Sequence, residues 1–253
     1  MNIVVLVKSI PDPNGDVAMG DDFLVNRDGE GTLDPGDEYA VEAALQLAEA
    51  TEGAVTVVSM GPAGAVSAIR RALSMGAHGG VLITDDALRG ADVLATARVL
   101  AAAVARSPFD LVLTGVESTD GYTGTLPMTI AELLGVPAVT FARKVEVGGG
   151  GIRVERQTEA GYDVVEAALP ALATVTAASS EPRYPTLKGI MGAKSKPLEE
   201  LTLADLELSP ADVAPTQRVG AIEPAPQKGP GEVVEGDAAA GRVADLLAEA
   251  KVI

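Results

Sequence analysis

Residues 3–7 read IVVLV, a continuous apolar run close to the start of the sequence. A strand in the middle of a parallel sheet is covered on both faces, so its residues are apolar throughout and do not alternate with polar ones. Comparable runs recur at residues 55–59, 81–84 and 110–113, and segments with helical spacing lie between them, as at residues 38–50. This alternation predicts an α/β fold, an open, mostly parallel sheet with helices on both faces.

From about residue 138 the pattern changes to short alternating segments. Residues 144–147, 151–157 and 162–168 predict antiparallel strands, and the glycines between the first two can supply the positive φ that a tight hairpin needs. Residues 171–177 read ALATVTA, which predicts a buried strand that returns to the main sheet. We therefore expect a small antiparallel extension of the sheet.

The sequence after residue 197 is rich in proline, glycine and glutamate, and residues 214–236 carry few apolar side chains. Such a composition is typical of an extended segment. We therefore assign residues 1–197 to one α/β domain and residues 198–253 to a C-terminal arm. The arm ends in an amphipathic helix at residues 238–253, whose apolar face is formed by Val243, Leu246, Leu247 and Ala250. This helix packs either on its own domain or on a partner chain, and the sequence leaves both open.

The composition disfavours several classes of function. The formal net charge of −17 argues against a nucleic-acid binder or an anionic-membrane binder. The absence of cysteine and the single histidine, His78, leave no thiolate metal site and no Ser-His-Asp triad of the usual kind. We expect His78 at the surface, at the end of a helix. No apolar run reaches the ~18 residues of a membrane span, and Met1-Asn2 carries no basic leader, so we expect a cytoplasmic protein.

Residues 114–127 read TGVESTDGYTGTLP and connect a predicted strand to a predicted helix. Glycines allow the backbone to approach a phosphate, hydroxyl groups donate to it, and the helix N-terminus adds a favourable dipole. The chain has neither a Walker-type phosphate loop nor a GxGxxG fingerprint after its first strand. Nothing in the sequence pairs Glu117 and Asp120 as catalytic carboxylates. The segment is therefore either a phosphate-binding loop or a plain connection.

Residues 181–197 read EPRYPTLKGIMGAKSKP and combine apolar residues with cations. Leu187, Ile190 and Met191 lie in a stretch flanked by lysines, which is unusual in so acidic a chain. One interpretation is a short amphipathic helix on the core. The other is a docking surface, since methionine adapts easily to different partners.

Further short pieces complete a pattern along the chain. In order they are Val7-Lys8 with Pro11-Asp12, residues 34–42 (DPGDEYAVE), 59–62 (SMGP), 71–77 (RALSMGA), 118–121 (STDG), 169–171 (LPA), and 181–184 (EPRY) running into 189–191 (GIM). Each piece alone is weak, but their order and spacing are specific. Together they resemble the electron transfer flavoprotein beta subunit family over essentially the whole chain.

The resemblance implies an electron-carrier subunit and not an enzyme. It implies a heterodimer with an alpha subunit that holds one FAD, and a structural AMP bound by the beta subunit. The backbone of Leu6 and Met60 would hold the adenine edge, and residues 118–125 would hold the ribose and phosphate. The whole AMP site would fall on Leu6, Asp34, Pro35, Gly36, Asp37, Met60, Gly115, Glu117, Ser118, Thr119, Asp120, Gly121, Thr123, Gly124 and Thr125. Independently of the resemblance, Asp34 or Asp37 can cap the helix that follows.

The resemblance also assigns a partner-recognition segment at residues 185–194, with Leu187 at the position of the family's partner-anchoring leucine. Its surface would comprise Leu187, Lys188, Ile190, Met191 and Lys194. The implied electron donors are acyl-CoA dehydrogenases, which act in fatty acid oxidation, and the implied acceptor is a quinone oxidoreductase. The arm at residues 198–253 would contact the alpha subunit.

Two positions depart from the family pattern. Residues 125–127 read TLP where many members carry Gln and Gly-Pro, and Gln157 stands where some relatives have an acidic residue that guides the flavin domain. Some members bind a second FAD in place of AMP and bifurcate electrons, whereas residues 37–39 and 140–141 favour the AMP-binding group. A stand-alone nucleotide-binding enzyme and a homodimeric nucleotide-sensing module stay open as alternatives, although the loop at residues 115–125 contains no cation for phosphate handling.

Overall fold

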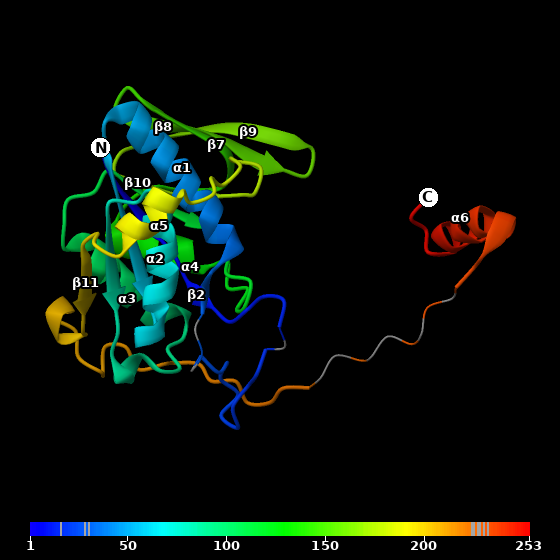
Figure 1. The fold of residues 1–253 in the computed structure, drawn as a ribbon, viewed down its shortest axis with the longest axis horizontal. Helices are drawn as coiled ribbons and strands as arrows, with labels where there is room; N and C mark the ends of the chain where they lie inside the picture. The colour runs from blue at the N-terminus through cyan, green and yellow to red at the C-terminus, as the bar shows by residue number, and fades with distance from the viewer. Residues whose placement is uncertain are drawn as a thin grey trace. The chain divides into compact units, whose positions relative to one another are not determined.

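The computed structural model describes residues 1–15, 17–27, 29, 31–223, 226, 229, 231 and 233–253. These residues form two compact units, Met1–Val219 and Gly220–Ile253. In the first unit nine strands form one sheet. In spatial order they are β11 (Leu198–Leu201), β5 (Gly79–Ile83), β4 (Ala54–Met60), β1 (Asn2–Leu6), β6 (Leu111–Gly115), β10 (Ala171–Val175), β7 (Ala138–Gly148), β8 (Gly151–Thr158) and β9 (Gly161–Ala168) (Figure 1). A separate antiparallel pair is formed by β2 (Ser9–Ile10) and β3 (Thr32–Leu33).

Helices cover both faces of the sheet, as the sequence predicts (Figure 1). One face carries α1 (Pro35–Thr51) and α2 (Val66–Met75), which share a core with the strands beneath them. The other face carries α3 (Val93–Ala105) and α4 (Leu126–Leu134), which contribute to a second core. The short helix α5 (Leu187–Ala193) packs against α2, and one-turn helices lie at η1 (Ala63–Ala65), η2 (Asp86–Leu88) and η3 (Ala204–Leu206). This is the layered arrangement of an open α/β protein.

The antiparallel extension grows out of the parallel sheet through β7. The start of β7 pairs in parallel with β10, at Ala138 and Val139, and the strand then pairs antiparallel with β8. Phe141 lies at the change of partner and has φ 56°, in the left-handed region that a β-bulge can require. The predicted extension is therefore confirmed, and its first strand begins earlier than the expected residue 144.

The chain beyond residue 197 does not leave the domain at once. Strand β11 pairs in parallel with β5 and adds an edge to the sheet, and Leu203, Leu206 and Val213 are buried in the second core. The compact unit consequently runs to Val219, past the boundary that we expected at residue 197. The second unit contains η4 (Gly236–Ala238) and the predicted terminal helix, α6 (Ala239–Glu249).

The strand order places a topological switch point beside β1. The chain passes from β1 through α1 to β4 on one side, and it returns through α3 to β6 on the other. Helices α1 and α4, which follow β1 and β6, lie on opposite faces. In open α/β sheets such a point opens a crevice at the carboxyl ends of the strands, and ligands bind there.

Candidate functional site

Three residues expected in the nucleotide site lie at neighbouring strand ends. Leu6 ends β1, Met60 ends β4 and Gly115 ends β6, and β1 lies between the other two strands. Leu6 stands opposite Thr114 in the β1–β6 register, so β6 ends one residue further on. Sequence positions more than fifty residues apart therefore meet at the switch point.

Asp34 joins the start of α1 to the loop that follows β6. It is fully buried and is the N-cap of α1, because its Oδ1 accepts a hydrogen bond from Gly36 N at 2.8 Å. Pro35 at the first helical position has no N–H and needs no such partner. The Asp34 Oδ2 accepts from Thr119 N at 2.7 Å and from Thr119 Oγ1 at 2.9 Å. Of the two caps that the sequence allowed, Asp34 is the one used, and it also fixes the loop.

Asp37 occupies the bottom of the crevice, one turn further along α1. Its Oδ2 accepts from Lys8 N at 2.7 Å, and its Oδ1 accepts from Gly115 N at 3.3 Å. Burial and the nearby Asp34 carboxylate raise the pKa of Asp37 to about 8, against the opposing effect of these two N–H donors. A Cβ at Gly115 would lie 2.8 Å from the Asp37 Oδ1, so the close approach requires glycine here.

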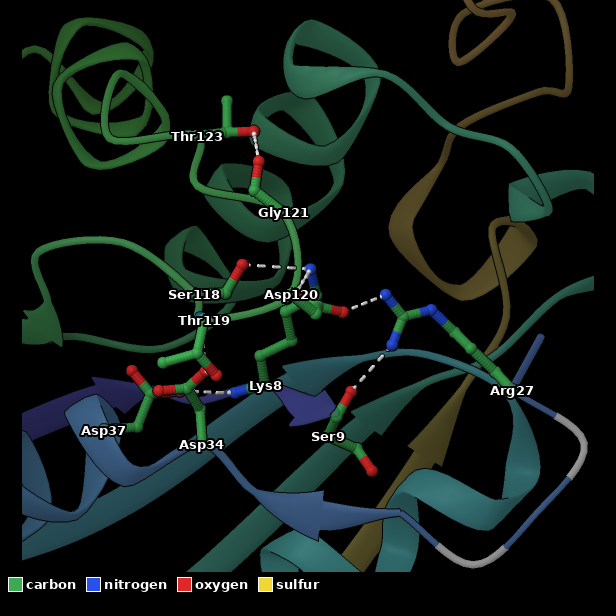
Figure 2. Close-up of polar contacts among 10 residues, drawn as sticks. All are labelled: Lys8, Ser9, Arg27, Asp34, Asp37, Ser118, Thr119, Asp120, Gly121 and Thr123. Carbon is green, nitrogen blue, oxygen red and sulfur yellow. Dashed lines mark hydrogen bonds and ion pairs between the residues drawn. The ribbon is translucent and has the colours of Figure 1, made fainter. Parts of the chain in front are cut away.

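Two cations reach the loop from distant parts of the sequence, as Figure 2 shows. Lys8 Nζ donates to Ser118 Oγ at 3.1 Å and to Asp120 Oδ1 at 2.7 Å. Arg27 forms an ion pair with the other Asp120 oxygen and donates to Ser9 O at 3.1 Å. Burial disfavours the Asp120 carboxylate, but Lys8 and Arg27 outweigh it and hold the pKa of Asp120 below its usual value. Residues 115–125 contain no cation, as the sequence shows. The folded site nevertheless contains two cations, Lys8 and Arg27, which come from outside the loop.

The second half of the loop is exposed and leads into α4. Gly121, Thr123, Gly124 and Thr125 are all exposed, and Thr123 Oγ1 donates to Gly121 O at 3.1 Å (Figure 2). Thr125 is the N-cap residue of α4, but its side chain does not cap the helix. At this end Leu126 N already donates to Thr123 O at 3.2 Å and Pro127 has no N–H, so the first turn of α4 offers few N–H groups to an acceptor.

Glu117 and a small cavity complete the surroundings of the crevice. Glu117 is exposed, and a Cβ at Gly124 would lie 3.2 Å from its Oε2. A cavity of about 180 Å³ opens beside Arg27, lined also by Ser9, Ile10 and Pro62. Pro62 follows the end of β4, so the cavity adjoins the strand ends where Leu6 and Met60 lie. The residues expected to bind AMP therefore lie around the carboxyl ends of β1, β4 and β6, and the sequence did not predict Lys8 and Arg27 there.

The recognition segment is held at both ends and exposed in the middle. Arg183 Nε and Nη2 donate to Glu42 of α1 at 2.7 and 3.0 Å, and Lys196 Nζ donates to Leu73 O of α2 at 2.9 Å. Between these anchors the exposed fraction of Leu187 is 75%. The other expected contact residues, Lys188, Ile190, Met191 and Lys194, are exposed too. The sequence left two interpretations, a short helix on the core and a docking surface. Features of both are present, since α5 packs on the domain and presents apolar side chains outward.

Other expected features are placed as follows. His78 is exposed just after α2, where its Nδ1 accepts a hydrogen bond from Val55 N at 3.0 Å. Within the described part of the chain, no cluster of three His, Asp or Glu side chains is arranged to hold a metal ion. In the same part, no helix is both long enough and apolar enough to cross a membrane.

The fold and the strand-end crevice define a class, the open α/β proteins whose ligands bind at a switch point. Comparison with known proteins narrows the class. The family model described as "Electron transfer flavoprotein domain" matches residues 22–206. The chain belongs to the electron transfer flavoprotein family, and specifically to its beta subunits.

Relatives of this name match over the full length of the chain. The electron transfer flavoprotein subunit beta of Mycobacterium tuberculosis (strain ATCC 25618 / H37Rv) is 42% identical over 100% of this chain and 99% of its own. That of Bacillus subtilis (strain 168) is 37% identical over 100% of both chains. A protein of Anaerotignum propionicum, named acryloyl-CoA reductase electron transfer subunit gamma, is 35% identical over 93% of each chain. The resemblance inferred from the sequence pieces is confirmed.

Proposed function

We propose that this chain is the beta subunit of a heterodimeric electron transfer flavoprotein that accepts electrons from acyl-CoA dehydrogenases and related flavin dehydrogenases. It passes them to a quinone oxidoreductase. The FAD, held mainly by the alpha subunit, supplies the redox chemistry. The chain itself binds AMP, docks the dehydrogenase and holds the alpha subunit, and it acts in the cytoplasm.

The observation that carries the AMP assignment is the fixing of the loop at residues 115–125 beside the carboxyl ends of β1 and β6. Asp34 fixes Thr119 by accepting from its N–H, and Lys8 fixes Ser118 and Asp120, so a loop rich in glycine and hydroxyl residues is held where a ligand of such a sheet would lie. The hydroxyl groups and the glycine backbone of such a loop suit a phosphate and a ribose. The donor set therefore fits a nucleotide, with the base at the strand ends of Leu6 and Met60.

The charges of the crevice favour a monophosphate over a polyphosphate. The carboxylates of Asp34 and Asp120 lie close to only two described cations, Lys8 and Arg27, and Asp120 already binds both of them. A triphosphate would bring several further negative charges to carboxylates, which is unfavourable in a partly buried site. This argument also disfavours a stand-alone ATP-hydrolysing enzyme.

Two features support partner docking by the recognition segment. It presents apolar side chains from a fixed backbone, so little conformational entropy is lost when a partner binds. It also carries Lys188 and Lys194 in a chain of net charge −17, which favours an apolar pocket with an acidic rim. A small contact of this kind is transient and allows partners to exchange.

The test is a nucleotide extraction. The chain is produced with its alpha subunit, the complex is denatured, and the released nucleotides are separated by chromatography. We expect one FAD and one AMP per heterodimer. Recovery of two FAD and no AMP would contradict the AMP assignment and would indicate a bifurcating subunit.

The same extraction on the chain produced alone is the control. We expect no tightly held flavin in it, because the alpha subunit holds the FAD. Yellow, FAD-loaded protein from this chain alone would overturn the proposal, and measurable ATP turnover would favour the stand-alone enzyme.

A further inference from the structure

Asp92 connects the beginning of α3 to the end of the first compact unit. Its Oδ1 accepts a hydrogen bond from Ala95 N at 2.9 Å, which is the N-cap contact of α3. Its Oδ2 accepts from Thr216 N at 2.6 Å, from Thr216 Oγ1 at 2.8 Å and from Gln217 N at 3.1 Å. One carboxylate thus caps a helix and binds a segment 124 residues further along the chain.

The segment that Asp92 binds leads directly to the C-terminal arm, which we now define as Gly220–Ile253. Arg98 of α3 donates to Asp212 O at 3.0 Å, and Val213 is fully buried, so the chain follows α3 up to this point. Gln217 then lies two residues before Val219, where the first unit ends. The contact with Asp92 is therefore close to the point at which the arm departs.

Apolar burial holds the chain at Val213 but not at the two residues that Asp92 binds. Thr216 and Gln217 are exposed, in contrast to Val213 just before them. The hydrogen bonds from Ala95, Thr216 and Gln217 lower the pKa of Asp92 to about 2, so the carboxylate is ionised at physiological pH. Hydrogen bonds to an ionised acceptor are roughly twice as strong as neutral ones, so this contact is a strong one for an exposed site.

We propose that Asp92 is the anchor that fixes where the C-terminal arm leaves the α/β unit, and that it thereby positions the arm for binding to the alpha subunit. The proposal rests on the proposed function in one respect, that the arm contacts the alpha subunit. Residues near Thr216 that are already ordered lose little conformational entropy when the arm binds. Without the anchor, these residues would have to become ordered when the arm binds, and the entropy lost would oppose association.

The test compares Asp92→Asn with Asp205→Asn in the full-length chain. Asparagine is as good an N-cap as aspartate, so its oxygen keeps the cap of α3, but the NH2 group that takes the place of Oδ2 is a donor and cannot accept from Thr216 or Gln217. Asp205 is a matched control because its Oδ2 also accepts from a threonine, Thr202 N at 2.8 Å and Oγ1 at 2.7 Å, but within a local turn. Thr216→Val, which removes only the hydroxyl bond, is a second variant with a smaller expected effect.

The first measurement is the rate of tryptic cleavage after Arg218 in the isolated chain. Cleavage requires local opening of the backbone, and Arg218 directly follows Gln217. We expect the rate to rise severalfold in Asp92→Asn, less in Thr216→Val, and not in Asp205→Asn. An unchanged rate in Asp92→Asn, or an equal rise in the control, overturns the anchor.

The second measurement is the dissociation constant of the heterodimer with its alpha subunit. We expect it to rise about tenfold in Asp92→Asn, the scale of a lost charge-assisted contact, and not in Asp205→Asn. Faster cleavage without weaker association would show an anchor that does not position the arm, which overturns the proposal. If the wild-type chain binds no alpha subunit, the proposed function fails, and cleavage after Arg218 still decides whether the anchor exists.

Discussion

Arg183 binds Glu42 through its backbone and its side chain at once. Arg183 N donates to Glu42 Oε2 at 3.1 Å, Nε to the same oxygen at 2.7 Å, and Nη2 to Oε1 at 3.0 Å. The exposed fraction of the Glu42 side chain is only 4%. Arg183, two residues before the recognition segment, is therefore fixed to the middle of α1.

Removing the arginine should destabilise the chain strongly. Arg183→Ala leaves the buried Glu42 carboxylate without its cation, and breaking a buried pair from one side costs about 3–5 kcal/mol. We expect the free energy of unfolding, measured by urea titration, to fall by about 3 kcal/mol. Arg153→Ala is the control, because Arg153 pairs with the exposed Glu146 at 3.2 Å and such pairs contribute about 0–1 kcal/mol. Equal losses in both variants would contradict this account.

Asp34 should affect both the stability of the chain, as the N-cap of α1, and the amount of bound AMP. Asp34→Ala removes the N-cap of α1 and the two bonds from Thr119, so we expect unfolding to become easier by about 2 kcal/mol and AMP to be lost. Asp85→Ala is a matched control, because Asp85 caps η2 at Ala87 N and accepts from the distant Leu203 N, away from the crevice. AMP extraction and urea titration check both variants. AMP retained in Asp34→Ala would show that AMP binding does not need the contact between Asp34 and Thr119.

The sequence predicted the parts of this molecule that depend on local pattern. The run at residues 3–7 indicated a central strand because both of its faces are apolar, and residues 114–127 were expected to connect a strand to a helix, as β6 and α4 show. It did not predict the contacts of Asp120 with Lys8 and Arg27, which are 112 and 93 residues away along the chain. A single sequence shows no pairing over such distances, and both cations lie outside the loop that suggested the site.

Asp37 should make stability depend on pH near neutrality. Its pKa is about 8 in the folded chain and near its ordinary 3.8 in the unfolded chain, so between these values only the folded state holds the proton. The resulting stabilisation is complete below about pH 4 and is lost as the pH rises through about 8. From pH 6 to pH 9 the free energy of unfolding should fall by about 3 kcal/mol more in wild type than in Asp37→Asn. Parallel urea titrations at both pH values test this, and identical falls would contradict it.

Leu187 should act on partner docking and not on folding. Its side chain is largely exposed, so Leu187→Ala should change the free energy of unfolding by less than about 0.5 kcal/mol. If it anchors a dehydrogenase, its loss should slow reduction of the heterodimer by the donor about tenfold, with FAD content unchanged. Leu133→Ala is the control, a partly exposed leucine on α4. An equal loss of flavin in Leu187→Ala would show that the residue is structural.

The apolar face of α6 should hold the alpha subunit. Val243, Leu246 and Leu247 are exposed in the arm, and burying a large apolar side chain contributes about 1.5–3 kcal/mol. Leu246→Ser with Leu247→Ser should therefore raise the dissociation constant of the heterodimer about 100-fold or more. The stability of the first unit should not change, because the arm is a separate compact unit. Asp245→Ser is the control, because it introduces a serine on the exposed polar side of α6, and it should leave the dissociation constant unchanged. A double serine variant that still pairs with wild-type affinity would show that the terminal helix does not bind the partner.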